Sequence, residues 1–517
     1  MTKIKRRTFL KGAAALSASG ALLHHFTSST AVQAQSSGPA GSTLPARSPL
    51  GISDDLFNPT EYSSIDGRLV KTMWMGFNKV ILPSGPTILR NFNDSLPGPT
   101  LRINAGDTLE LAFENRLPEN RPDQPTEVNI PNHFNTTNLH YHGFHVSPKG
   151  NSDNVYLNIE PGDKFNYVVQ VPKDHPAGSY WYHPHRHGSV SAQVAQGAAG
   201  MAIIKGALDD VPAIKEAVER VLVIQAPIPG VDGILDSEDP IWPLDAERDF
   251  LVNGEYKPRI YIREGEVQRW RILHAGDAQF FPFKIDGLEI YEIGRDGNPL
   301  PEARLVEEVH LSPGNRVDVL VKGATPGAYL LRRPFFDQGK QSLPPVHLAN
   351  IYVIPANDSR VPPGTPFGRE IPKGPLPDNP ILVDITDAEI THRRKIVLGV
   401  EDVKGYFHDT LFTINDEPFD PKRDDVVSKL GSVEEWTLIN TTPFPHPIHI
   451  HVNPFQVMSV NGVADPDKPW MDTIAVPAAG TVVFRTRFLD FDGRYVMHCH
   501  ILPHEDTGMM INVNIEP

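Results

Sequence analysis

The stretch Gly106-Asp107-Thr108-Leu109-Glu110-Leu111 decides the fold, because the chain repeats its pattern twice. A glycine and a polar residue again open a strand-like run at Gly265-Glu266-Val267-Gln268-Arg269-Trp270 and at Gly431-Ser432-Val433-Glu434-Glu435-Trp436. Two landmarks that recur three times in the same order indicate three copies of one domain. The second landmark is a glycine turn followed by a Gly-x-Tyr strand, at Gly178-Ser179-Tyr180, Gly327-Ala328-Tyr329 and Gly493-Arg494-Tyr495.

Short β-strands are expected between these landmarks. Apolar and polar residues alternate in residues 165–171, 317–321 and 481–488, and a period of two is typical of half-buried strands. The 40 glycines and 50 prolines favour many short strands and turns. We therefore predict an all-β chain of three Greek-key β-sandwich domains. The repeats place these domains at residues 56–207, 208–355 and 381–517, with a proline-rich tether at residues 356–380.

Residues 1–34 are predicted to be an export signal. Arg6-Arg7-Thr8-Phe9-Leu10-Lys11 resembles a twin-arginine motif, and the apolar residues 12–23 that follow are too few to span a bilayer. The alternative is a basic tail without export. We expect a mobile leader at residues 35–55, the twin-arginine export machinery as a partner, and a periplasmic or secreted protein without a membrane span.

The charge and the histidines narrow the class of function. A formal net charge of −15 argues against a nucleic-acid partner. Residues i and i+2 of a strand face the same side, so each His-x-His pair can offer two imidazoles to one metal such as copper, zinc, iron or nickel. The pairs occur in four motifs: His140-Tyr141-His142, His183-Pro184-His185, His446-Pro447-Ile448-His449-Ile450-His451 and His498-Cys499-His500.

Cys499 indicates which metal the chain binds. It is the only cysteine, which excludes an internal disulfide. A thiolate with two histidines and a weak, distant methionine makes a blue-copper electron-transfer site. His504 and Met509 follow Cys499 by five and ten residues, and His446 is available from an adjacent strand. A structural zinc site normally takes four strong ligands and more cysteine, so copper is favoured.

The middle repeat has none of these ligands. Phe281-Pro282-Phe283-Lys284-Ile285-Asp286 aligns with the motif that begins at His446, and Arg332 stands where the outer repeats have His183 and His498. The sequence therefore predicts one blue copper in the third domain. It also predicts a cluster of metal ions that eight histidines of the first and third domains hold together.

These motifs resemble those of the multicopper oxidases, a family that includes laccases, bilirubin oxidases, spore-coat oxidases and cuprous oxidases. The resemblance covers nearly the whole chain after the predicted signal, and it implies cupredoxin-like domains with four copper ions. Carried over motif by motif, it implies type 1 ligands His446, Cys499, His504 and axial Met509; type 2 ligands His140 and His449; and type 3 ligands His142, His183, His185, His451, His498 and His500.

Three further histidines lie outside the family's ligand set, and one other position departs from its motifs. His133, His145 and His187 match no family ligand, and we interpret them as structural residues or as residues that support the ligands without binding metal. Val452 stands after the last histidine of its motif, where many members have glycine.

The resemblance implies a laccase-like enzyme. Four one-electron oxidations of a reductant at type 1 copper would be coupled to reduction of O₂ to water at the three-copper cluster. Cys499 would transfer electrons from type 1 copper towards the three-copper cluster. Glu505 and Asp153 would act as catalytic groups that supply the protons consumed in O₂ reduction.

Phenols or aromatic amines are the expected reductants. An oxidase that takes Cu(I) would bind it with methionine thioethers, which suit that ion. No methionine occurs between Met201 and Met458, which favours organic reductants instead. We expect these substrates to reach type 1 copper at an exposed edge near His504.

The alternatives are a cuprous or other metal-ion oxidase that takes Cu(I), a bilirubin oxidase, and a copper-less structural or cell-division relative. That last class would have lost ligands, and none is missing. A copper nitrite reductase would have two domains per chain, and an electron carrier only the type 1 site.

Overall fold

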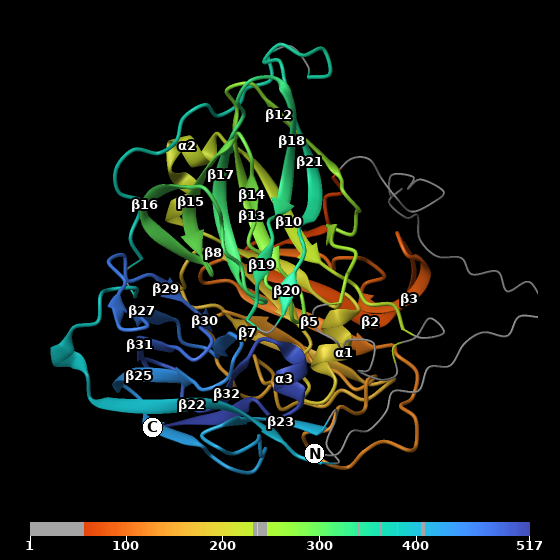
Figure 1. Cartoon of the computed structure of the whole chain (residues 1–517), viewed down its shortest axis with the longest axis vertical. Helices are drawn as coiled ribbons and strands as arrows, with labels where there is room; N and C mark the ends of the chain where they lie inside the picture. Colours follow the sequence, from red (N-terminus) through yellow and green to blue (C-terminus); the bar gives the residue numbers. More distant parts are fainter. Residues whose placement is uncertain are drawn as a thin grey trace, which may run out of the picture. The chain divides into compact units, whose positions relative to one another are not determined.

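A computed structural model describes residues 56–230, 235, 246–339, 341–361, 364–379, 381–404 and 409–517. The predicted export signal and the predicted leader lie outside these residues. Within the described ranges, no helix is both long and apolar enough to cross a bilayer. The described chain is dominated by strands, as the sequence predicted, and the strands form three consecutive pairs of sheets with a two-stranded hairpin attached to the second (Figure 1).

The first pair of sheets contains the first landmark strand, β5. One sheet has the order β3-β2-β5-β7 and the other has the order β1-β4-β9-β8-β6. The strands are β1 (Glu61–Ser63), β2 (Arg68–Leu82), β3 (Gly85–Phe92), β4 (Thr100–Asn104), β5 (Thr108–Asn115), β6 (His140–His142), β7 (Lys164–Gln170), β8 (Gly178–His183) and β9 (Gly200–Lys205).

The second pair has the orders β11-β10-β13-β17-β15-β16 and β12-β21-β18-β14, and the hairpin β19-β20 accompanies it. The strands are β10 (Val218–Gln225), β11 (Leu251–Val252), β12 (Arg259–Arg263), β13 (Val267–His274), β14 (Lys284–Ile285), β15 (Glu289–Arg295), β16 (Asn298–Val306), β17 (Arg316–Lys322), β18 (Gly327–Arg333), β19 (Phe336–Asp337), β20 (Ser342–Leu343) and β21 (Val346–Ile354).

The third pair has the orders β23-β22-β25-β31-β27-β28, with β29 against β27, and β24-β33-β32-β26-β30. The strands are β22 (His392–Asp402), β23 (Thr410–Ile414), β24 (Val426–Lys429), β25 (Val433–Asn440), β26 (His446–Ile450), β27 (Phe455–Val460), β28 (Val463–Ala464), β29 (Trp470–Met471), β30 (Thr473–Val476), β31 (Thr481–Arg487), β32 (Gly493–Cys499) and β33 (Met510–Glu516).

Strand pairing repeats in the same way in all three pairs of sheets. Each landmark strand, β5, β13 or β25, has a parallel partner on one side and an antiparallel partner on the other. Each pair also encloses an apolar core of its own, around Phe113, Trp270 and Trp436 respectively. The three sequence repeats therefore fold with the same strand pairing.

Strand β17 differs from the half-buried strand that its alternation predicted. Both of its faces are buried, because Val317 and Val319 enter the core of the second pair while Leu320 packs on the other side with Leu208. Asp318 on that side accepts a hydrogen bond from Ser179 of β8 in the first pair. Contact with the first pair of sheets therefore buries the face of β17 that the alternation of apolar and polar residues predicted to be exposed to solvent.

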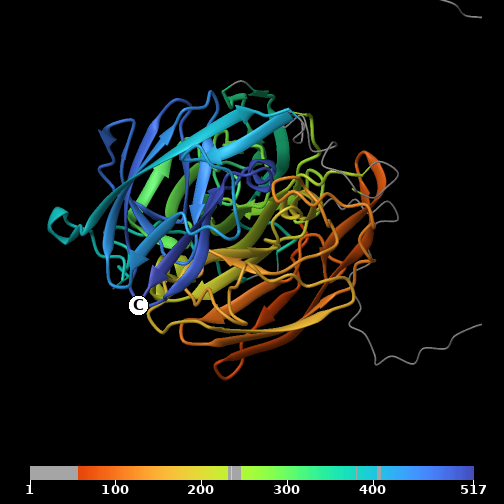
Figure 2. The same ribbon diagram turned by 90° about the horizontal axis from the view of Figure 1, so that it is seen from below.

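The helices are short and lie between strands. They are α1 (Val190–Ala195), η1 (Ala207–Asp210), α2 (Pro212–Lys215), η3 (Asp387–Glu389) and α3 (Leu502–Asp506). Helix α3 lies beside α1, where Leu502 packs on Val190 and Val194 (Figure 1). In the view from below, the orange strands of the first pair and the blue strands of the third lie side by side (Figure 2).

The described part of the predicted tether follows the surface of the second pair of sheets. The Gly368 N–H donates to the Glu216 carbonyl and the Val267 N–H donates to the Gly368 carbonyl. Further along, the Leu376 N–H donates to the Pro301 carbonyl. These bonds hold the segment against the sheets, while the domain limits given above stay predictions.

Candidate metal centre

Four strands bring eight of the predicted ligands together between the first and third pairs of sheets. In β6 and β8, His140 pairs with His183, and in β26 and β32, His449 pairs with His498. The equivalent pair in the second domain is Lys284 of β14 with Arg332 of β18. At these register positions of the described strands, the outer domains have histidines and the second domain has none, as the repeat alignment predicted.

The histidine rings of the two domains interleave. His142 stacks on His449 with 3.7 Å between ring centroids, and His140 stacks on His451 at 4.0 Å. The His185 Nε2 lies 3.1 Å from the His498 Nε2. The remaining two, His183 and His500, lie with their ring centroids 5.5 Å apart and complete the histidine cluster.

The histidine cluster suits a metal because its ring nitrogens are buried, neutral and unpaired. Burial lowers the pKa of His140, His183 and His500 well below the ordinary value, and neighbouring histidines lower it further. Nitrogens without a hydrogen-bond partner in the described structure are His140 Nε2, His142 Nδ1, His183 Nε2, His449 Nε2 and both nitrogens of His451 and His500. Neutral imidazoles whose buried nitrogens have no hydrogen-bond partner are suited to bind metal ions.

Cys499, together with His446 and His504, forms a second group of side chains that can bind a metal ion. The Cys499 Sγ lies 3.4 Å from the His446 Nδ1 and 3.8 Å from the His504 Nδ1, and these two nitrogens are 3.3 Å apart. All three side chains are buried. Burial raises the pKa of the Cys499 thiol, so a bound cation would be needed to hold it as thiolate.

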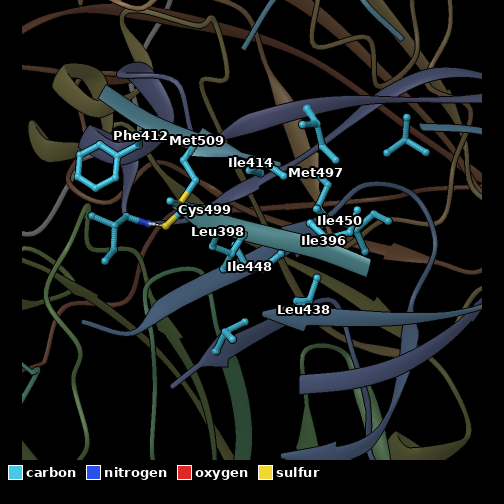
Figure 3. Close-up of a cluster of buried hydrophobic side chains, with 14 of the residues drawn as sticks. Ile396, Leu398, Phe412, Ile414, Leu438, Ile448, Ile450, Met497, Cys499 and Met509 are labelled. Carbon is cyan, nitrogen blue, oxygen red and sulfur yellow. Dashed lines mark hydrogen bonds between the residues drawn. The ribbon is translucent and has the colours of Figure 1, made fainter. Parts of the chain in front are cut away.

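Met509 adjoins this group and Met510 does not. The Cys499 N–H donates to the Met509 carbonyl, and the Met509 N–H donates to the His504 carbonyl. Cys499, Met509 and Phe412 belong to one buried cluster (Figure 3). The Met510 side chain packs elsewhere, with Val155, Phe419 and Val496. The two neighbouring methionine side chains therefore pack in different clusters, and only that of Met509 belongs to the cluster of Cys499.

The edge near His504 is not exposed, contrary to the expectation from sequence. His504 is only 2% accessible, because the Phe412 ring stacks on it at 3.9 Å and the Phe444 ring lies 5.6 Å away. Phe444 also packs edge-on against His446 at 5.2 Å. Thr442 hydrogen-bonds the His446 Nε2 at 2.9 Å. Aromatic rings therefore form the immediate surroundings of these two histidines.

The two predicted catalytic acids lie against the histidine cluster. Both oxygens of Asp153 are 3.0 Å from the His140 Nδ1, and the Tyr141 N–H donates to Asp153 Oδ1. Glu505 Oε2 lies 2.8 Å from the His498 Nδ1 and its Oε1 lies 3.5 Å from the His185 Nδ1. Burial raises the pKa of Asp153 to about 8 and that of Glu505 to about 7.

Sequence reasoning missed the ion pair of Arg316 and Asp472. Asp472 lies 3.1 Å from the His142 Nε2, and its backbone carbonyl is 2.8 Å from the His449 Nδ1. Arg316, from the ligand-free second domain, forms a buried bidentate pair with Asp472. No spacing in the sequence connects these residues, because they come from two repeats and neither belongs to a histidine motif.

Two of the unassigned histidines have polar partners outside the histidine cluster. The His187 Nε2 lies 3.1 Å from Asn129 Oδ1, and the His133 N–H donates to Gln124. Both residues line a surface cavity of about 950 Å³ whose wall also includes the cluster residue His185. The cavity therefore adjoins the histidine cluster at His185.

Known proteins resemble this chain along most of its length. Three family profiles, each described as multicopper oxidase, match residues 121–208, 234–351 and 377–517, which together exceed half of the chain. A laccase of Bacillus stratosphericus is 29% identical over 490 residues, covering 85% of this chain and 93% of that protein. The multicopper oxidase mco of Staphylococcus aureus is 25% identical over 438 residues, covering 82% and 83%.

The solved structures agree with the sequence relatives. A multicopper oxidase of Campylobacter jejuni, described as a metallo-oxidase, is 28% identical with a TM-score of 0.74, covering 90% of this chain and 95% of that chain. Together with the profile matches and the two groups of buried histidines, this places the present chain among the cupredoxin-like copper oxidoreductases. The chain belongs to the multicopper oxidase family.

Proposed function

We propose that this laccase-like enzyme oxidises phenols or aromatic amines and reduces O₂ to water with four copper ions. The observation that carries the substrate class is the aromatic surround of His446 and His504, made by Phe412 and Phe444. Flat apolar rings suit aromatic donors, whereas Cu(I) is best bound by thioethers. No methionine occurs in residues 202–457, from which both phenylalanines come.

The residues present fit the four copper ions of the family. His446, Cys499, His504 and Met509 would hold type 1 copper, and the mixed thiolate, imidazole and thioether set is the one that copper prefers. His140 and His449 would hold type 2 copper. The six remaining histidines, His142, His183, His185, His451, His498 and His500, would hold the type 3 pair. Bound copper supplies the one-electron redox couple and the site of O₂ reduction.

The chain itself provides the route between the two groups. Cys499 is the last residue of β32 and lies between His498 and His500 in the chain, so a thiolate that received an electron would be joined by the backbone to two histidines of the cluster. The Ile501 N–H lies 3.4 Å from the Cys499 Sγ and donates to it, which fixes the sulfur in place. Donor oxidation and O₂ reduction can therefore occur at separate places without movement of substrate between them.

Two carboxyl groups are placed to supply the protons that O₂ reduction consumes. Glu505 contacts histidines of the proposed type 3 pair, and Asp153 contacts the proposed type 2 ligand His140. With pKa values raised towards neutrality, both acids can hold a proton at working pH and release it to a neighbouring base. We further propose export by the twin-arginine pathway to the periplasm or medium, on the strength of the motif at Arg6-Arg7.

Steady-state O₂ uptake with a phenol, bilirubin and Cu(I) side by side tests the substrate class. We expect the highest kcat/KM with the phenol. Phe444→Met provides a matched control, because it puts a thioether beside the type 1 group and should raise kcat/KM for Cu(I) relative to the phenol. A much higher value for Cu(I) than for any phenol in the wild-type enzyme would show instead a metallo-oxidase, the description given to the Campylobacter jejuni structure.

Met509→Leu is expected to raise the reduction potential of type 1 copper. A weak axial thioether donates to oxidised copper, and leucine removes that donation. We expect a rise of the order of a tenfold change in the one-electron equilibrium, about 59 mV. Redox titration of the blue absorption measures it. Met510→Leu is the control, since that side chain packs in another cluster, and a shift in this variant alone would reverse the assignment.

A further inference from the structure

His145 lies outside the proposed ligand sets but joins the first domain to the third. It follows the His140-Tyr141-His142 motif and is 4% accessible. Its side chain reaches two loops of the third domain. One loop contains Val452, directly after the proposed ligand His451, and the other contains Asp490, just before the strand that ends in Cys499.

Three hydrogen bonds fix the position of His145. Its Nδ1 lies 2.6 Å from the Val452 carbonyl oxygen, and its Nε2 lies 2.7 Å from Asp490 Oδ1. Its backbone N–H donates to the His175 Nε2 at 2.9 Å. The Phe491 ring packs edge-on against the imidazole at 4.9 Å. Both the backbone and the ring of His145 are therefore constrained.

The contacts determine which nitrogens carry protons. A carbonyl oxygen can only accept, so Nδ1 must donate to Val452, and an ionised carboxylate at Nε2 requires a second donor. The hydrogen bond from His145 lowers the pKa of Asp490 below its ordinary value, which keeps that carboxylate ionised. His175 accepts at Nε2 and donates its Nδ1–H to the Pro176 carbonyl, so it is neutral. The His145 ring therefore lies between two hydrogen-bond acceptors, the Val452 carbonyl and Asp490.

Val452 has a backbone conformation that valine disfavours. Its φ is +45°, in the left-handed region that glycine enters freely and β-branched residues rarely adopt. The side chain is 5% accessible and packs in the core of the third domain. Such a conformation persists only where the surroundings over-determine it. The bond from His145 to the Val452 carbonyl is one such constraint, from another domain.

The direction of His451 depends on this turn. Its ring stacks on His140 at 4.0 Å, and neither of its nitrogens has a hydrogen-bond partner in the described structure. No hydrogen bond to the ring fixes its orientation, so the backbone at residues 451 and 452 sets it together with the contacts of neighbouring rings. We propose that His145 is a positioning residue, a buried ring that holds the left-handed turn at Val452 and so aims His451 at the metal cluster.

This role rests on the proposed function, because it takes His451 as a copper ligand. Loss of a residue that orients a metal ligand commonly weakens metal affinity 10- to 100-fold. For copper-loaded His145→Ala, we expect the chelator concentration that removes half of the cluster copper to fall by about 10- to 100-fold. The electron paramagnetic resonance and near-ultraviolet absorption of the cluster copper should change, while the blue absorption of type 1 copper stays.

Lys149→Ala is the matched control. Lys149 pairs with Asp492 at 2.6 Å and so joins the same two segments, but it has no bond to Val452. Exposed pairs of this kind contribute little, so we expect copper retention within about twofold of wild type. Equal losses in His145→Ala and Lys149→Ala would reduce His145 to a simple link between domains and overturn the proposal.

Rescue tests the connection through Val452 directly. Glycine at position 452 adopts the turn without help, and asparagine tolerates it well. In the His145→Ala background, Val452→Gly or Val452→Asn should restore copper retention to within about threefold of the corresponding single variant, as expected for coupled sites. No recovery in either double variant would contradict the proposal.

If His145→Ala does not fold, a further variant, His145→Gln, still tests the proposal. His145→Gln keeps a donor for the Val452 carbonyl but not the second ring nitrogen that contacts Asp490, and we expect intermediate retention. Retention equal to wild type would refute the need for both ring contacts. If the wild-type protein itself held no cluster copper, the proposed function would fail; if wild type and His145→Ala held it equally well, only the role of His145 would fail.

Discussion

Replacing Cys499 by serine is expected to abolish both the blue absorption and the oxidase activity while cluster copper stays bound. A serine hydroxyl does not form the copper–thiolate bond from which the colour comes, and the electron entry point is lost with it. The eight cluster histidines lie outside the group of His446, Cys499 and His504, so their copper should remain. One of the four expected copper ions should be missing.

The variant is expected to stay folded. The serine oxygen can accept the Ile501 N–H bond that the Cys499 Sγ accepts now. Burial of a hydroxyl in this apolar core costs on the order of 1–3 kcal/mol if it is poorly bonded, which a domain of this size tolerates. Copper analysis, visible spectroscopy and O₂ uptake on the same sample check the result. An intense blue band that survives the substitution would refute the type 1 assignment.

The histidine motifs could be predicted as sites because strand periodicity places i and i+2 on one face. That rule needs no knowledge of the fold, and the observed register of β26 with β32, His449 opposite His498, brings the predicted faces together. The ligand-free second domain was equally predictable, since Lys284 and Arg332 fill the same register positions. Local pattern and internal repeat were sufficient for both conclusions.

Contacts from strands without a motif, and contacts between repeats, could not be predicted in this way. The Phe412 ring over His504 comes from β23, a strand with no motif, and it buries an edge that the sequence left open. Arg316 reaches Asp472 across 156 residues, and both faces of β17 are buried for the same reason, contact between domains. Alternation within a strand reports only the core of its own domain and is silent about a neighbour that covers the other face.

Glu505→Gln is expected to lower kcat and to remove the pH dependence that Glu505 gives to turnover. Burial raises the pKa of Glu505 to about 7, so the group is protonated below that pH and loses its proton above it. The positive charge of bound copper draws this pKa downwards, so the inflection should fall at or below about 7. Wild-type kcat should therefore decline as pH rises through the inflection, because the proton donor is lost.

Glutamine cannot donate a proton at any pH. In the acid plateau, kcat of Glu505→Gln should fall by about 10²- to 10⁴-fold, the usual contribution of a positioned general acid, and the inflection should disappear. Copper content should not change, because the carboxyl group contacts His498 and His185 without belonging to either ligand set. Glu505→Asp is the control, since it keeps a titratable group and should keep an inflection. Profiles of kcat against pH that coincide for wild type and Glu505→Gln would show that protons reach the cluster by another route.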